Sequence, residues 1–243
     1  KYCEFGNLPE EDIGVDAFIL DPDNPRIIQI PPPNEVPSIS LNIEGDINDL
    51  KNCSATVTLR NDFFSSSLQA QNELTGVKLE NFLCTLISTN FYKISLDYFK
   101  LSEEKKDALV YSANADLSKF IISSTTSKYI PKIPFLVIDN DLLERTEDPY
   151  PLYLPYRKRM TFTLNLGVDK YEVNDEQFKI GEDQSGTFTA SLKKDNKQKI
   201  EIKYEIKQLS KYLDRDAKVR FLEFCSGYLK SKKEMFILSG SRP

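Results

Sequence analysis

Five stretches of the sequence alternate apolar and polar residues with a period of two, and this pattern constrains the fold more than any other feature. In one of them, Phe162 and Leu164 alternate with Thr161 and Thr163. A strand of this kind has one face on a core and the other in water, as in antiparallel sheets. The five stretches are residues 38–43, 53–60, 161–166, 188–192 and 200–206. We therefore expect a mainly β protein built largely from antiparallel strands.

Two other segments predict helices because their apolar residues recur at helical spacing. The first lies between Gly76 and Asn90, and the second lies near the C-terminus. Asp214 and Asp216 precede the second segment and lysines follow it, the charge order that the helix macrodipole favours. The apolar positions are Leu79, Phe82, Leu83, Leu86 and Ile87 in the first segment, and Phe221, Phe224, Cys225, Tyr228 and Leu229 in the second.

Proline-rich stretches suggest how the chain is divided. Pro31-Pro32-Pro33 and Pro37 predict a stiff connector. Pro131 and Pro134 favour a boundary near residue 130, after which residues 135–138 would open a second sheet. A boundary near 150 is the alternative. We expect an extended segment over 1–36 and two antiparallel β-sandwich-like domains over 37–130 and 131–243, each with one accessory helix. A hairpin loop at 193–198 and a closing strand at 235–238 that returns to the sheet belong to the second domain.

The absence of His limits the chemistry more than any other compositional feature. Without imidazole, Ser–His and Cys–His catalysis and His-ligated metal sites cannot be built within the chain. A net charge of −5 disfavours nucleic acid as a partner, and no apolar run reaches the roughly 18 residues of a membrane span. We expect a non-catalytic chain with no cofactor and no metal. An enzyme using acidic residues alone is the less favoured alternative, since no spacing nominates a catalytic carboxylate pair.

Four cysteines are present, at Cys3, Cys53, Cys84 and Cys225, and no two form a CxxC pair. This spacing does not resemble a zinc site or a small disulfide scaffold. Cys53 and Cys225 lie on apolar stripes, which favours core packing over a redox or metal-binding role. Cys3 has no His that could activate it as a nucleophile.

Two kinds of charged cluster also have a functional and an ordinary interpretation. Residues 21–24 and 139–141 could supply oxygens to calcium, but neither continues as a 12-residue calcium loop, so turns are favoured. The lysines near the predicted hairpin suggest a nucleic-acid or membrane surface, but Glu201 and Glu205 among them favour a solvated strand face. These lysines are Lys193, Lys194, Lys197, Lys199, Lys203 and Lys207.

Several short motifs resemble one architecture of bacterial transglutaminase-like proteins. The opening Phe5-Gly6-Asn7-Leu8-Pro9, followed by Gly14, Ala17 and Asp21, is similar to the segment just after the catalytic core of those proteins. They combine an N-terminal β-rich domain, a papain-like transglutaminase core and further β-rich sequence of unknown function. The resemblance continues in residues 54–60, in Glu144-Arg145 with Pro149, and in Pro155-Tyr156-Arg157 before the strand at 161–166.

This resemblance implies an accessory role. The catalytic Cys, His and Asp of the family lie upstream of the opening motif, so none corresponds to a residue of this chain. The chain would be a C-terminal region that stabilises or orients the upstream transglutaminase-like domain or binds its protein substrate. Its location would be the periplasm, the cell surface or the medium. The alternative is a free-standing extracellular module that binds protein or glycan.

Overall fold

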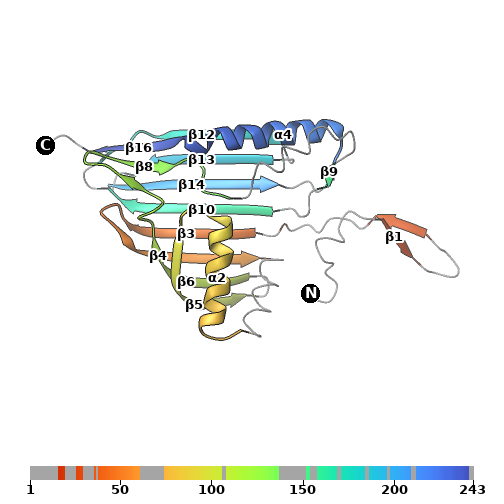
Figure 1. Cartoon of the computed structure of the whole chain (residues 1–243), viewed down its shortest axis with the longest axis horizontal. Helices are drawn as coiled ribbons and strands as arrows, with labels where there is room; N and C mark the ends of the chain where they lie inside the picture. Colours follow the sequence, from red (N-terminus) through yellow and green to blue (C-terminus); the bar gives the residue numbers. More distant parts are fainter. Residues whose placement is uncertain are drawn as a thin grey trace.

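The computed structural model describes most of the chain from residue 38 to residue 240 and short parts of the N-terminal segment. The described residues are 16–19, 26–29, 36, 38–60, 74–105, 108–136, 152–153, 158–168, 171–183, 186–195, 198–208 and 212–240. All structural statements below concern these residues. They form a mainly β structure with two α-helices, which confirms the predicted fold class (Figure 1).

Along the chain, one group of strands precedes the first helix, a second group lies between the two helices, and one strand follows the second helix. They are β1 (Asp16–Ile19), β2 (Arg26–Gln29), β3 (Ser38–Asp46), β4 (Asp49–Arg60), α2 (Val77–Asn90), β5 (Ser95–Lys105), β6 (Ala108–Asp116), β7 (Ile122–Ser123), β8 (Ser127–Pro131), β9 (Leu152–Tyr153), β10 (Lys158–Gly167), β11 (Tyr171–Glu172), β12 (Glu176–Asp183), β13 (Gly186–Lys194), β14 (Lys199–Gln208), β15 (Tyr212–Leu213), α4 (Arg215–Lys230), the 3-10 turn η3 (Ser231–Lys233) and β16 (Met235–Gly240). Both helices lie where the sequence predicts them, and the Asp214 carboxylate caps α4 by accepting a hydrogen bond from Ala217 N at 2.8 Å.

One eight-stranded sheet contains strands from both predicted domains. Its order is β12-β13-β14-β10-β3-β4-β6-β5 (Figure 1). The neighbours β3 and β10 run parallel, with Met160 opposite Ile39 and Leu164 opposite Ile43. Every other neighbouring pair in this sheet is antiparallel. The strands on either side of residue 130 therefore belong to one sheet rather than to two separate sandwich-like domains.

The other strands differ from the predicted arrangement in three places. The closing strand β16 pairs with β8 and β11 in a four-stranded sheet, not with the large sheet. Where a second sheet is predicted to open, Phe135 makes an isolated bridge to Phe91, and residues 137 and 138 of the predicted strand lie outside the described residues. Within the predicted extended segment 1–36, β1 and β2 pair as a small antiparallel sheet. In each case the local sequence pattern can indicate that a segment is extended, but it does not indicate which other strand the segment pairs with.

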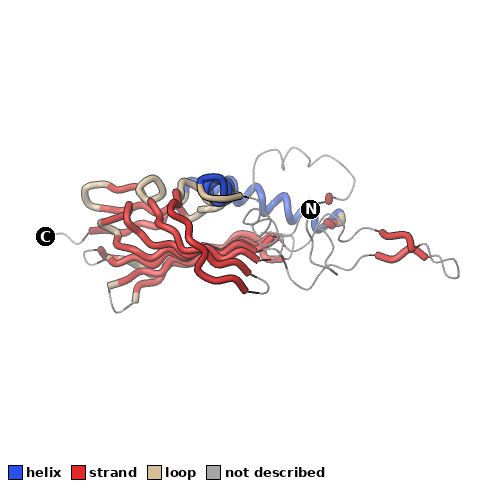
Figure 2. The backbone as a smooth tube through the Cα atoms, turned by 90° about the horizontal axis from the view of Figure 1, so that it is seen from below, coloured by secondary structure: helices blue, strands red, loops and turns tan. Residues whose placement is uncertain are grey.

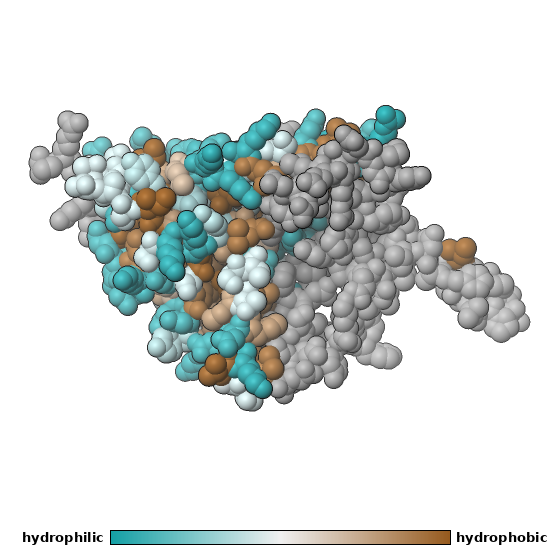
Figure 3. Space-filling model, in the orientation of Figure 1, coloured by the Kyte–Doolittle hydropathy of each residue, from teal (hydrophilic) through white to brown (hydrophobic). Residues whose placement is uncertain are grey.

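The described helices and the four-stranded sheet cover only one face of the large sheet (Figure 2). In Figure 2 the helices and the small sheet lie on one side of it. On that side α2 packs on β5, and α4 packs on β12 and β13. The covered side, seen in Figure 3, shows hydrophobic and hydrophilic residues interspersed over its described surface. The core is therefore a layer between the large sheet and the elements on this side.

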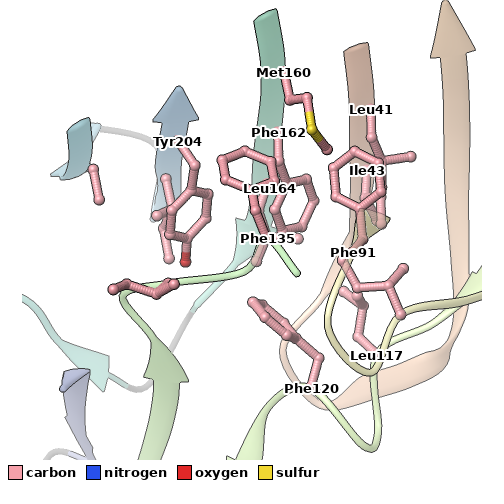
Figure 4. Packing of buried hydrophobic residues seen from close by; sticks show 14 of the residues in the cluster. Leu41, Ile43, Phe91, Leu117, Phe120, Phe135, Met160, Phe162, Leu164 and Tyr204 are labelled. Carbon is pink, nitrogen blue, oxygen red and sulfur yellow. The ribbon is translucent and has the colours of Figure 1, made fainter. Parts of the chain in front are cut away.

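Aromatic rings fill the centre of this layer (Figure 4). The rings of Phe162 and Tyr204 stack with centroids 5.3 Å apart, and Phe91 and Phe120 meet Phe162 edge-on at 6.0 and 5.7 Å. The ring centroids of Phe135 and Phe91 are 5.6 Å apart. These rings come from β10, β14 and the connections on the covered side, so they bind the two layers together.

Two buried tyrosine hydroxyls attach the segment after β8 to this core. Tyr204 Oη donates a hydrogen bond to the carbonyl of Pro131 at 2.9 Å, and Tyr228 Oη donates one to the carbonyl of Phe135 at 3.0 Å. Burial raises the pKa of both phenols well above their usual range, so both remain donors. The chain between residues 131 and 135 is thereby held from both ends.

Replacing Cys225 by Ser is expected to lower the free energy of unfolding by about 1–3 kcal/mol, because a hydroxyl replaces a thiol at a fully buried position of α4. The control is Cys84→Ser, since Cys84 is partly exposed and a serine hydroxyl can keep its hydrogen bond to the Leu96 carbonyl. Urea unfolding of both variants measures the difference. An equal or larger loss in Cys84→Ser would contradict the assignment of Cys225 to the core.

Candidate functional site

Cys53 and Cys84 are in environments that disfavour the thiolate. Burial, followed by the nearby carboxylates of Asp49, Asp116 and Asp46, raises the pKa of Cys53 from 9.0 to about 11. Burial and the carboxylates of Glu80 and Asp97 raise the pKa of Cys84. A protonated thiol is a poor nucleophile and a poor metal ligand. The surroundings of Cys53 and Cys84 are therefore typical of cysteines that pack in the structure and not of reactive thiols.

The metal-binding alternatives find no support in the part of the chain that the structure describes. There, no group of three or more His, Cys, Asp or Glu residues could hold a metal ion. The two predicted acidic turns at 21–24 and 139–141, and Cys3, lie outside the described residues. None of the described helices is long and apolar enough to cross a membrane.

On the side of the large sheet that no described element covers, five central strands present a polar surface, which we call the open face. It consists of the polar residues that alternate with the core residues of five central strands, and each of them is exposed or half-buried. Hydroxyl, amide and charged groups therefore face outward side by side. The members are Ser38, Ser40, Asn42 and Glu44 of β3; Ser54, Thr56, Thr58 and Arg60 of β4; Thr161, Thr163 and Asn165 of β10; Thr187, Thr189, Ser191 and Lys193 of β13; and Glu201, Lys203, Glu205 and Lys207 of β14.

Strand register arranges these side chains in rows across the sheet. Thr163 lies between Lys203 and Asn42, and Thr161 lies between Glu205 and Ser40 in the next row. The hydroxyls of Ser40 and Thr161 are 2.6 Å apart and hydrogen-bonded. The central rows thus offer short polar groups on three adjacent strands, with longer charged side chains on β14.

The ends of two hairpins enclose a hollow of about 480 Å³ at one end of the open face. Gly167 of β10 lies opposite Lys199 on one side and opposite Asp46 on the other. Because Gly167 has no side chain, the sheet surface is depressed between Lys199 and Asp46. The hollow is lined by Glu44, Gly45, Asn165, Gly167, Lys193, Lys194, Asp195, Lys199, Ile200 and Glu201.

The walls of the hollow carry charges of both signs. Lys194 Nζ donates a hydrogen bond to the Tyr171 carbonyl at 3.0 Å, and the Asp195 carboxylate accepts one from Lys199 N at 2.9 Å. Glu201 pairs with Lys203 at 2.8 Å. Among the described residues, no ion pair crosses the hollow from Lys199 to Glu44.

Sequence reasoning located the lysines of this hairpin but not the hollow. Lys193, Lys194, Lys199 and Lys203 are exposed, while Lys197 lies outside the described residues. The missed signal is the glycine at the end of the strand 158–167, Gly167, which lies opposite Asp46 and one position beyond the Leu166–Gly45 pair. That pairing joins residues about 120 positions apart and could not be read from local patterns.

No protein-family model, no curated protein and no solved structure matches this chain. The similarity to transglutaminase-like proteins therefore rests on the short sequence motifs alone.

The raised pKa of Cys53 predicts a loss of stability in alkali. As pH rises from about 9 to about 11, the unfolded thiol loses its proton while the folded one keeps it, so unfolding becomes more favourable. Cys53→Ala is expected to show a shallower decline over this range. A smaller decline persists in the variant because burial also raises the pKa of Tyr111, to about 12. The raised pKa values of Tyr204, Tyr228 and Cys84 contribute to it as well. Urea unfolding at several pH values gives both slopes, and equal slopes in the two proteins would contradict the assignment.

Proposed function

We propose that this chain is a non-catalytic domain that binds another protein through its open face. One observation carries the proposal: the described elements cover only one side of the eight-stranded sheet, and its other side presents rows of Ser, Thr and Asn flanked by charges. Such short side chains lose little conformational entropy when a partner orders them. They also supply donors and acceptors to the polar groups of a protein surface.

A protein fits this surface better than a glycan does. Sugars are commonly held by aromatic rings that stack on their apolar faces, and the described members of the open face include no aromatic residue. The aromatic rings of the described strands lie instead in the core, as Phe162 and Tyr204 do. Mixed charges such as the Arg159–Glu205 pair at 2.6 Å are typical of the polar rim of a protein interface.

The absence of catalysis is supported by the state of the thiols. Acyl transfer by a papain-like mechanism requires a thiolate activated by an imidazole. The chain has no His, and the pKa values of Cys53 and Cys84 are raised rather than lowered. An accessory role beside a catalytic domain agrees with both facts.

The motifs quoted above make a transglutaminase-like domain the proposed neighbour. If the resemblance holds, that domain lies immediately upstream of Phe5-Gly6-Asn7-Leu8-Pro9. In this proposal the chain stabilises or orients the upstream domain, or binds its protein substrate, outside the bacterial cytoplasm.

The reading frame upstream of Lys1 is expected to encode a papain-like domain with a Cys, a His and an Asp in catalytic positions. Sequencing the gene tests this directly. A frame without such a domain would contradict the transglutaminase relation but would leave binding through the open face to be tested by itself.

Thr163→Arg is expected to weaken binding to the upstream domain about tenfold or more, because a long charged side chain would stand above the short central rows. The matched control is Val219→Arg, which places the same side chain on the exposed outer surface of α4. Titration calorimetry with the separately produced upstream domain measures both affinities. Equal weakening by the two variants, or no binding by the unchanged chain, would overturn the open face as the binding surface.

A further inference from the structure

The outer face of the four-stranded sheet carries a row of three large side chains, which we call the Ile–Tyr–Ile row. Tyr129 of β8 lies opposite Ile122 of β7 on one side and opposite Ile237 of β16 on the other. The next residues along β8 and β16, Ile130 and Phe236, are fully buried, and the Phe236 ring meets the large sheet. Because side chains alternate along a strand, the row points away from the large sheet. Ile122 is 51% exposed and Ile237 is 55% exposed.

The neighbouring rows of the same face carry no charge on these three strands. Ser127 of β8 lies opposite Ser239 of β16, and its carbonyl accepts a hydrogen bond from Ser124 N at 2.8 Å on the side of β7. Beyond the other edge of the Ile–Tyr–Ile row, Met235 lies opposite Pro131. Exposed apolar side chains that lie together inside a polar rim are typical of protein interaction sites, whereas single exposed apolar residues are ordinary.

Both rows are symmetrical about β8, and this symmetry favours a second copy of the chain as the partner. An isoleucine flanks Tyr129 on either side, and a serine flanks Ser127 on either side. A twofold axis parallel to β8 and above it exchanges the two sides. It would place Ile237 of each copy over Ile122 of the other, and the two Tyr129 rings over one another. We infer that the four-stranded sheet binds the same sheet of a second copy, face to face, in an isologous dimer.

No ion pair has to form or break in this interface. Each copy has a net charge of −5, so two copies repel one another at long range, but the contact is made over uncharged rows. A strongly charged partner would find no complementary charge there. Sheets packed face to face lie about 10 Å apart, a gap that Ile and Tyr side chains from both faces fill. Stable interfaces usually bury about 1,200 Å² or more, and this patch covers a few rows of three strands, so we expect a weak dimer.

This interface is separate from the open face and does not depend on the proposed function. The four-stranded sheet lies on the covered side of the large sheet (Figure 2), and the Ile–Tyr–Ile row points away from that sheet. A dimer formed through the row therefore leaves the open face of each copy unoccupied. Each dimer would present two open faces and would bind two partner molecules.

Opposite charges placed at the two ends of the row test both the interface and its axis. Ile237→Lys and Ile122→Glu each place two unpaired charges in their own dimer. In an equimolar mixture, the heterodimer has one Ile–Ile contact and one Lys–Glu contact, because residue 237 of each copy meets residue 122 of the other. Val219→Lys is the control, since Val219 is an apolar residue of α4 that is 52% exposed and lies outside the row.

Sedimentation equilibrium of the unchanged chain is expected to show a monomer–dimer equilibrium that added salt does not weaken, because salt screens the repulsion between like-charged copies. Ile237→Lys and Ile122→Glu are each expected to raise the dimer Kd about tenfold or more, and their mixture is expected to associate more tightly than either variant alone. Val219→Lys is expected to leave the Kd unchanged, and circular dichroism checks that each variant is folded.

Three results would overturn the inference. They are a chain that stays monomeric up to about 1 mM, a mixture no tighter than its components, and equal weakening by Val219→Lys. None of them bears on the open face, whose binding is tested through Thr163.

Discussion

The parallel pairing of β3 with β10 is the interaction on which the rest of this structure depends. It joins residues 38–46 to residues 158–167, and all other neighbours in the large sheet are antiparallel. Through this one pair, the antiparallel strands before residue 130 and those after it form a single surface. A parallel pair needs a long connection between its strands, and here that connection contains α2, β4 to β8 and the segment held by Tyr204 and Tyr228.

The one-sided covering of the sheet follows from this junction. The connection between β3 and β10 returns over one face, where Phe91, Phe120 and Phe135 pack around Phe162. Burial of such rings is the main source of stability in this layer, at about 25 cal/mol per Å² of apolar surface removed from water. On the opposite face no described element covers the Ser, Thr and Asn side chains, which are exposed or half-buried, and it is this face that we propose binds protein.

Local patterns predict both helices and five strands of the large sheet, because period-two and helical spacing record which face of an element is buried. Thr161–Leu166 and Phe221–Leu229 show this directly. These patterns do not predict β5, β6 and β12 of the same sheet. They do not record which strand lies beside which, so a sequence boundary near Pro131 suggested two domains where the sheet is continuous. For the same reason the hollow could not be predicted from the sequence, because its lining residues Glu44 and Lys199 are brought together only by strand pairing. The open face itself is visible in the sequence as the polar half of each alternation.

The central claim is that the strands on both sides of residue 130 form one cooperative unit. Differential scanning calorimetry tests this claim most directly. If β3 and β10 join them into one sheet with one core, the described part of the chain unfolds in a single transition. The ratio of calorimetric to van't Hoff enthalpy is then about 1. Two separable transitions, one for residues 37–130 and one for residues 131–243, would contradict the account.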